Sequence, residues 1–132
     1  MIYLDTNVLV RCAVRDNEMQ FRLAQQLILA NEVMVLTGTL VEFEWVMRSL
    51  YGIRRSGIAD ALRRICGMPG LAVDEEVVIE RAIAAYSIGF DLADAVFIVQ
   101  AEMRGGDRFA TFDKKLLRKC RDISTTVAAF RP

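Results

Sequence analysis

The chain has 132 residues and no net charge, and 54% of its residues are hydrophobic. This length suits one domain with a buried core, and this composition excludes a disordered chain and a strongly basic overall field. Histidine is absent, which excludes Ser-His-Asp and Cys-His catalysis and His-ligated zinc or iron, so any chemistry must use other side chains or a hard metal held by oxygen.

The first half of the chain alternates short apolar runs with amphipathic segments. The run Met1–Leu4 ends abruptly at Asp5, which predicts a buried parallel strand followed by a turn. A short helix is expected from Val8, behind the capping-type residues Thr6 and Asn7. The elements expected next are a helix capped by Asn17, a strand over Val33–Leu36, a helix over Leu40–Tyr51 behind the turn Thr37–Thr39, and a helix over Arg54–Cys66.

The second half continues the alternation. Its expected elements are a strand over Leu71–Val73, a helix from the acidic Asp74–Glu76 to Ser87, a helix over Asp91–Met103, a strand over Arg108–Phe112, one or two helical turns over Lys114–Cys120, and a last strand over Ser124–Val127. Strands that alternate with helices predict a single α/β domain with a mostly parallel sheet and helices on both of its faces.

The sequence also bears on cellular location. Its N-terminus has no basic region and no cleavage-site pattern, and no apolar run reaches membrane-spanning length, so we expect a cytoplasmic protein. The three cysteines, Cys12, Cys66 and Cys120, are widely spaced and odd in number, which argues against a disulfide framework. We interpret them as small buried hydrophobic residues in a reducing compartment.

Two acids follow predicted strands. Asp5 comes directly after the first strand, and Asp113 comes directly after Arg108–Phe112. The carboxyl ends of strands in open α/β sheets border the ligand crevice, and a charge buried there is costly unless it is paired or bound to a metal. The alternative for each acid alone is a helix N-cap. Because both acids share this placement, we favour a functional site.

Two further acids lie in apolar helical segments. Glu42 is in the start of the Leu40–Tyr51 helix, and Asp94 is three residues after Asp91 on one helix face. The alternative is that such acids lie on a narrow solvated stripe or cap a helix, and this alternative is stronger for Asp91 and Glu44.

Carboxylates that converge need a counter-charge. Because the chain has no histidine, the natural counter-charge is Mg²⁺ or Mn²⁺, which activates water for phosphodiester hydrolysis.

Four segments resemble the PIN-domain family, in particular its toxin ribonucleases of the VapC kind. They occur in the family's order and extend over nearly the whole chain, and one of them matches a Glu-x-x-Trp-Val pattern. The segments are Leu4–Arg11, Leu40–Gly52, Phe90–Ala95 and Ala110–Lys115. The resemblance implies a three-layer α/β/α domain with a mostly parallel central sheet of four or five short strands, and an enzyme that cuts RNA with Mg²⁺ or Mn²⁺.

Carried over by position, the resemblance implies an acidic quartet of Asp5, Glu42, Asp94 and Asp113. Asp5 and Asp94 would be the closest metal ligands. Glu42 and Asp113 would act as further ligands or through water.

The resemblance also implies supporting residues. Thr6 and Asn7 would hold the hydrogen bonds of the site, with Asn7 nearest the carboxylates, and Thr111 would support the loop before the last acid. Asp91 would lie behind the metal ligands. Glu44 departs from the apolar residue usual in the family at that position, and it should point away from the site because it is two residues from Glu42 on a helix.

The resemblance implies partners as well. Such toxins usually form dimers, and a small cognate antitoxin blocks the site, often with an Arg that reaches the acids. The apolar helices Phe21–Ala30 and Leu40–Tyr51 would supply antitoxin and dimer surfaces, although most of their apolar residues should be core. Four basic clusters could contact the RNA backbone, or each could form only a solvated face. They are Arg54–Arg55, Arg63–Arg64, Lys114–Lys115 and Arg118–Lys119.

Other functions remain open. A haloacid-dehalogenase-like phosphoryl-transfer enzyme needs a second Asp two residues after the first, where this chain has Asn7. A receiver domain needs an acceptor Asp after a central strand, and Leu71–Val73 leads only into Asp74–Glu76. A PIN-like module used only for binding would be indicated by an incomplete quartet. DNA is an alternative substrate, because nothing in the sequence identifies a contact to a 2′-hydroxyl.

Overall fold

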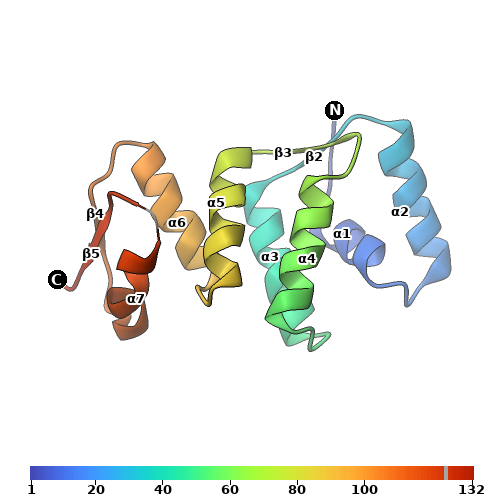
Figure 1. The fold of residues 1–132 in the computed structure, drawn as a ribbon. Coiled ribbons are helices and arrows are strands. Elements are labelled where there is room, and N and C mark those ends of the chain that lie inside the picture. Colours follow the sequence, from blue (N-terminus) through green and yellow to red (C-terminus); the bar gives the residue numbers. More distant parts are fainter. Residues whose placement is uncertain (124) are drawn as a thin grey trace. The chain divides into compact units, whose positions relative to one another are not determined.

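The computed structural model describes residues 1–123 and 125–132. The chain divides into two compact units, Met1–Glu76 and Val77–Pro132, and Figure 1 shows the elements of both.

The first unit contains a parallel three-stranded sheet. Its strands are β1 (Ile2–Tyr3), β2 (Val33–Val35) and β3 (Leu71–Val73), in the order β1-β2-β3. Ile2 pairs with Val33, and Val33 pairs with Leu71. The parallel strands at these positions are as predicted, since each is a short run of β-forming apolar residues.

The expectation that the first strand is buried is wrong. Ile2 is 37% exposed and Tyr3 is 61% exposed. In the first unit β1 is an edge strand, bonded to β2 alone. Leu4, which follows β1, is the buried residue of this run, and its N–H donates to the carbonyl of Met34 at 3.0 Å.

Four helices complete the first unit. They are α1 (Thr6–Ala13), α2 (Glu18–Ala30), α3 (Thr37–Ser49) and α4 (Arg55–Cys66). Helix α1 packs against both α2 and α3, and α3 packs against α4. Their apolar faces bury the largest side chains of this unit, among them Leu9, Leu40, Phe43, Ile58 and Leu62.

The N-terminal ends of the helices agree with the sequence prediction in part. Asn17 caps α2 as expected, since its side chain accepts from the Gln20 N–H at 3.1 Å. Helix α1 is capped by Asp5, rather than by the residues after it. Helix α3 begins at Thr37, so Thr37–Thr39 is its first turn and not a separate turn before it.

The second unit contains helices and a pair of short strands. Its elements are α5 (Glu76–Ser87, with Glu76 in the first unit), α6 (Leu92–Met103), β4 (Arg108–Ala110), α7 (Lys114–Lys119), the 3-10 turn η1 (Cys120–Asp122) and β5 (Ala128–Phe130). Strands β4 and β5 are parallel, and Arg108 pairs with Ala128.

The prediction of a last strand over Ser124–Val127 is wrong. Ser124 lies outside the described residues, and the strand is Ala128–Phe130. The residues before it are engaged by the carboxylate of Glu102, which accepts from the Thr125 hydroxyl at 3.0 Å and from the Thr126 N–H at 2.7 Å. These residues connect η1 to the strand instead of forming it.

The strand before Asp113 is also shorter and less buried than expected. It ends at Ala110, and Phe112 is 70% exposed. The N–H of Thr111 still donates to the carbonyl of Phe130 at 2.9 Å, which continues the pairing by one residue. Asp113 therefore follows a short strand with two residues between.

The α/β class with parallel strands is confirmed. The described pairing places the strands in a three-stranded sheet and a two-stranded sheet, one in each unit, rather than in one continuous sheet. All three cysteines are free: Cys120 is buried as expected, whereas Cys12 and Cys66 are half-buried. Among the described residues, no helix is both long and apolar enough to cross a membrane.

Candidate active site

In the first unit, Asp5 lies where β1 gives way to α1. Its backbone is extended (φ −78°, ψ 158°), and its Oδ1 accepts a hydrogen bond of 2.7 Å from the Thr6 N–H. Asp5 is exposed, and its Oδ2 has no protein partner within the described residues. The N-cap alternative is therefore correct for Asp5, yet half of its carboxylate remains available to a ligand.

Thr6 connects this turn to α3. Its hydroxyl donates to Oε2 of Glu42 at 2.9 Å, and Thr6 itself is only 6% exposed. Glu42 is exposed and is 36 residues further along the chain. Because α1 packs on α3, the start of α1 holds the Glu42 carboxylate in a defined orientation.

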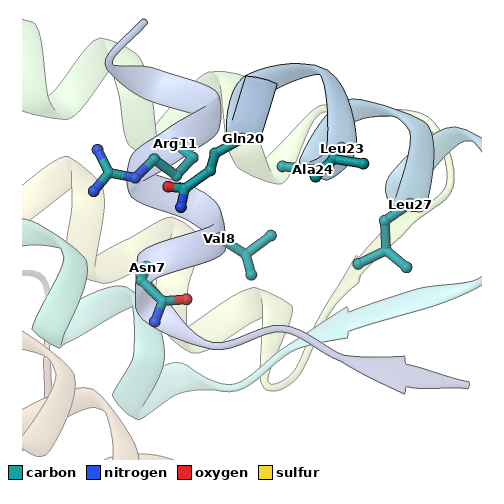
Figure 2. Close-up of a pocket in the computed structure, with 7 residues that line it drawn as sticks. All are labelled: Asn7, Val8, Arg11, Gln20, Leu23, Ala24 and Leu27. Atoms are coloured by element: carbon teal, nitrogen blue, oxygen red, sulfur yellow. The ribbon is translucent and has the colours of Figure 1, made fainter. Parts of the chain in front are cut away.

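Asn7 is exposed and lines a pocket of about 540 Å³ between α1 and α2. Figure 2 shows it near one end of α1, on the same helix as Val8 and Arg11. In the part of the chain that the structure describes, its side chain forms no hydrogen bond to an acid of the predicted quartet.

Glu44 is the buried acid of α3. It is 4% exposed, and its Oε1 accepts from Nε of Arg48 at 2.7 Å. The interpretation of Glu44 as part of a solvated stripe is therefore wrong. An ion pair one helical turn away satisfies its charge, whereas Glu42 faces Thr6.

In the second unit, three acids line one pocket of about 240 Å³: Asp91, Asp94 and Asp113. Asp91 caps α6, and its Oδ1 accepts from the Asp94 N–H at 3.0 Å. The cap places Asp94 in the first turn of α6, on the same side as Asp91.

Asp94 has the perturbed titration expected of a functional carboxyl. Partial burial raises its pKa, and the negative charges of Asp91 and Asp113 raise it further. The positive charge of Lys115 opposes these effects. The net upward shift in the pKa means that its surroundings disfavour the ionised form of Asp94, first through burial and then through the neighbouring acids.

Asp113 caps α7. Its Oδ1 accepts from the N–H groups of Lys115 at 2.8 Å and Leu116 at 3.1 Å. The N–H of Asp113 donates to the hydroxyl of Thr111 at 3.0 Å, so Thr111 braces the turn that presents the acid. Oδ2 of Asp113 has no hydrogen-bond donor among the residues described.

The candidate acids differ from the ion-paired acids of the protein. Several other acids pair with an arginine, among them Asp16, Glu18, Glu44, Asp60 and Glu102. Within residues 1–123 and 125–132, no such pair involves a member of the predicted quartet. The quartet acids thus keep oxygen atoms that the protein leaves without a cation.

The donor chemistry fits a hard divalent cation. Every candidate ligand is a carboxylate, and Asp91, Asp94 and Asp113 line one pocket. In the described part of the chain, no three acidic or cysteine side chains are close enough together to hold a metal ion by themselves. Mg²⁺ often binds through one or two carboxylates with waters and substrate phosphates, so pairs of acids still fit it.

The structure also separates residues that the sequence grouped together. Lys115 and Lys119 line the acid pocket, whereas Lys114 and Arg118 do not. The sequence offered no signal for this division, because Lys114 and Arg118 are also four residues apart on the same helix.

The chain is an α/β protein whose candidate acids form no ion pair with an arginine or lysine among the described residues. A family model, described as PIN domain, matches residues 2–122, and the chain belongs to the PIN-domain family. The match includes residues of both compact units. No curated protein and no solved structure matches the chain. PIN domains are typically nucleases, so membership indicates a nuclease.

Proposed function

We propose that this PIN-domain protein is a Mg²⁺- or Mn²⁺-dependent endoribonuclease that acts as the toxin of a toxin–antitoxin pair. The observation that carries the nuclease part is Asp94, half-buried beside Asp91 and Asp113 with its pKa raised. The toxin role rests on the resemblance of the four segments to toxins of the VapC kind.

The proposed metal ligands are Asp5 and Glu42 of the first unit and Asp94 and Asp113 of the second. A divalent cation bound by such carboxylates would neutralise charge on the phosphodiester and activate water for attack. Thr6 fixes the orientation of Glu42, and Thr111 fixes the turn before Asp113. These contacts hold the acids in place before substrate binds, which is the property that a metal-dependent nuclease requires.

A cognate antitoxin is the proposed partner of the α1–α2 pocket. Figure 2 shows residues of both helices around this pocket, among them Val8 of α1 and Leu27 of α2. Leu23, which also lines it, is 59% exposed. An amphipathic segment could cover these apolar side chains, and its Arg would supply the charge that the quartet acids lack.

The expectation that the apolar residues of these helices are mostly core is wrong for α2. Of its residues only Ala24 and Ile28 are buried, and Met19, Leu23 and Leu29 are exposed. Trp45 of α3 and Leu50, the C-cap residue that follows α3, are exposed. These two side chains are candidates for the surface of a homodimer.

The test uses purified protein freed of antitoxin. It should cut RNA with Mg²⁺ or Mn²⁺ and should not cut it with EDTA. Asp5→Asn should abolish cutting and leave the fold intact, because Asn is also a good N-cap. The matched control is Asp107→Asn, an exposed acid outside the quartet that should cut like wild type. Full activity of Asp5→Asn, or cutting in EDTA, would contradict the mechanism.

The alternative is a PIN-like module that binds a partner without catalysis. It predicts no cutting of RNA or of single-stranded DNA with any divalent cation. If DNA is cut and RNA is not, the nuclease assignment stands and the substrate changes. The toxin role predicts a small reading frame beside this gene that encodes the antitoxin. Its co-expression should restore growth that the toxin alone arrests.

A further inference from the structure

The acid pocket of the second unit is lined on one side by two lysines of α7. Lys115 and Lys119 are one helical turn apart and share the face that carries the buried Leu116. Lys114 and Arg118 are on the same short helix and do not line the pocket. The helix therefore presents two of its four basic residues to the acids.

Lys119 is held at the pocket by a backbone contact. Its Nζ donates to the carbonyl of Gly89 at 3.4 Å, and Gly89 also lines the pocket. Gly89 has φ +113°, and a Cβ added there would lie 3.2 Å from this Nζ. A glycine at this turn thus leaves room for the amine beside the acids.

Lys115 lines the pocket together with the three aspartates. Among the described residues, no ion pair joins its amine to Asp94. An amine that is near a carboxylate without being fixed to it is available to another anion. The net charge of the pocket lining is −1, from the three aspartates Asp91, Asp94 and Asp113 and these two lysines.

We propose that Lys115 and Lys119 bind the phosphodiester backbone of the RNA substrate at the acid pocket, and that Lys114 and Arg118 do not. This assignment rests on the proposed function. Carboxylates alone repel a phosphate, whereas two amines beside them attract it and fix where the chain lies relative to Asp94 and Asp113. Phosphate contacts of this kind position a nucleic acid without reading its sequence.

The experiment compares two double variants of the full chain. Lys115→Gln/Lys119→Gln removes the pocket amines, and Lys114→Gln/Arg118→Gln removes the same charge from the same helix. Binding of a labelled single-stranded RNA is measured in EDTA at several salt concentrations. The pocket variant should lose roughly tenfold in affinity, and its salt slope should fall by about 0.7 for each lost contact. The control variant should stay close to wild type.

Lys115→Gln alone, which retains the contact of Lys119 with Gly89, repeats the test if the double variant is unstable. Circular dichroism and thermal unfolding identify such instability. With Mg²⁺, the single variant should raise the KM for RNA more than it lowers kcat.

Equal losses by the two double variants would show general attraction to α7 and would overturn the proposal, as would unchanged binding by the pocket variant. Either result leaves the nuclease assignment standing if wild type still cuts RNA with metal. Absence of cutting by wild type would instead contradict the proposed function itself.

Discussion

The Thr6 hydroxyl donates a hydrogen bond of 2.9 Å to Oε2 of Glu42. Thr6 also donates its N–H to Asp5 at 2.7 Å, so one residue contacts both acids that the first unit contributes to the proposed site. It is 6% exposed, which shields these contacts from water. The orientation of Glu42 on α3 thus depends on the start of α1.

Thr6→Val should test this dependence. The substitution keeps the shape of the side chain and removes the donor, so it should lower the free energy of unfolding by about 1 kcal/mol. If Glu42 binds metal, the variant should also bind Mn²⁺ more weakly. Urea unfolding and a Mn²⁺ titration measure the two effects.

Thr39→Val is the matched control, since Thr39 is a half-buried threonine in α3 with no hydrogen bond from its hydroxyl among the residues described. It should leave Mn²⁺ affinity unchanged. Equal effects of the two substitutions would show that the Thr6 contact does not orient Glu42.

Divalent metal should stabilise the folded protein. A ligand that binds only the native state at 100 times its Kd adds about 2.7 kcal/mol to the free energy of unfolding. Mg²⁺ or Mn²⁺ should therefore raise the thermal midpoint, and EDTA should reverse the rise. Asp5→Asn and Asp94→Asn should each lose most of this shift. Asp107→Asn should retain it, and a retained shift in both site variants would refute the assigned ligands.

Asp94→Asn should stabilise the metal-free protein at neutral pH. The pKa of Asp94 is raised by partial burial and by Asp91 and Asp113, so the native state disfavours the ionised form. As pH falls towards the ordinary aspartate pKa of about 3.9, Asp94 takes up its proton in the native state before it does so in the unfolded state. The free energy of unfolding of wild type therefore increases relative to that of the variant as the pH falls. The advantage of the variant should be greatest above the raised pKa and should shrink as pH falls.

Urea unfolding of both proteins in EDTA across pH measures this difference. Asp91→Asn is a second test of the same electrostatic effect, because Asn preserves the N-cap of α6 and removes one negative charge near Asp94. It should lower the pKa of Asp94. A pH-independent difference between wild type and Asp94→Asn would contradict the electrostatic explanation.

Glu102→Gln should destabilise the second unit in a pH-dependent way. Arg81, the Thr126 N–H and the Thr125 hydroxyl all bond to the Glu102 carboxylate and lower its pKa to about 2. Since the shift is downward, its stabilising effect is complete above the ordinary glutamate value of about 4.3 and is lost as pH falls towards about 2.

The difference in urea midpoint between wild type and Glu102→Gln should therefore be largest at neutral pH and should narrow in acid. Glu80→Gln makes the same charge change at an exposed position of α5 and should have little effect. Similar midpoints for the two variants at pH 7 would contradict the role of the Glu102 contacts.

Most secondary structure could be predicted because its signals are local. The strand Leu71–Val73 and the caps Asn17 and Asp91 are where the sequence placed them. The last strand was misplaced because the apolar residues from Val127 to Phe130 offer no local register. Pairing with β4 and the bonds to Glu102 select Ala128–Phe130.

For the acids too, the sequence predicted the features that depend on local pattern and missed one that depends on packing. The sequence identified Asp5, Glu42, Asp94 and Asp113 as candidates from their positions beside predicted strands and in apolar helical segments. It misjudged Glu44, although the spacing of Glu44 and Arg48 allowed an ion pair one turn away. Burial of Glu44 depends on which face of α3 packs against α1 and α4, and the local sequence pattern does not specify that face.

By itself, the sequence restricted the candidate metal ligands. It contains no histidine, and carboxylates stand at the starts of its predicted helices, so oxygen donors and a hard metal were the natural choice. Helix periodicity and capping residues determined most element positions. Only the tertiary structure decided which acid Thr6 contacts, which basic residues of α7 line the acid pocket, and why the pKa of Asp94 rises. These properties depend on distances between residues far apart in the chain, because burial and charge act through space.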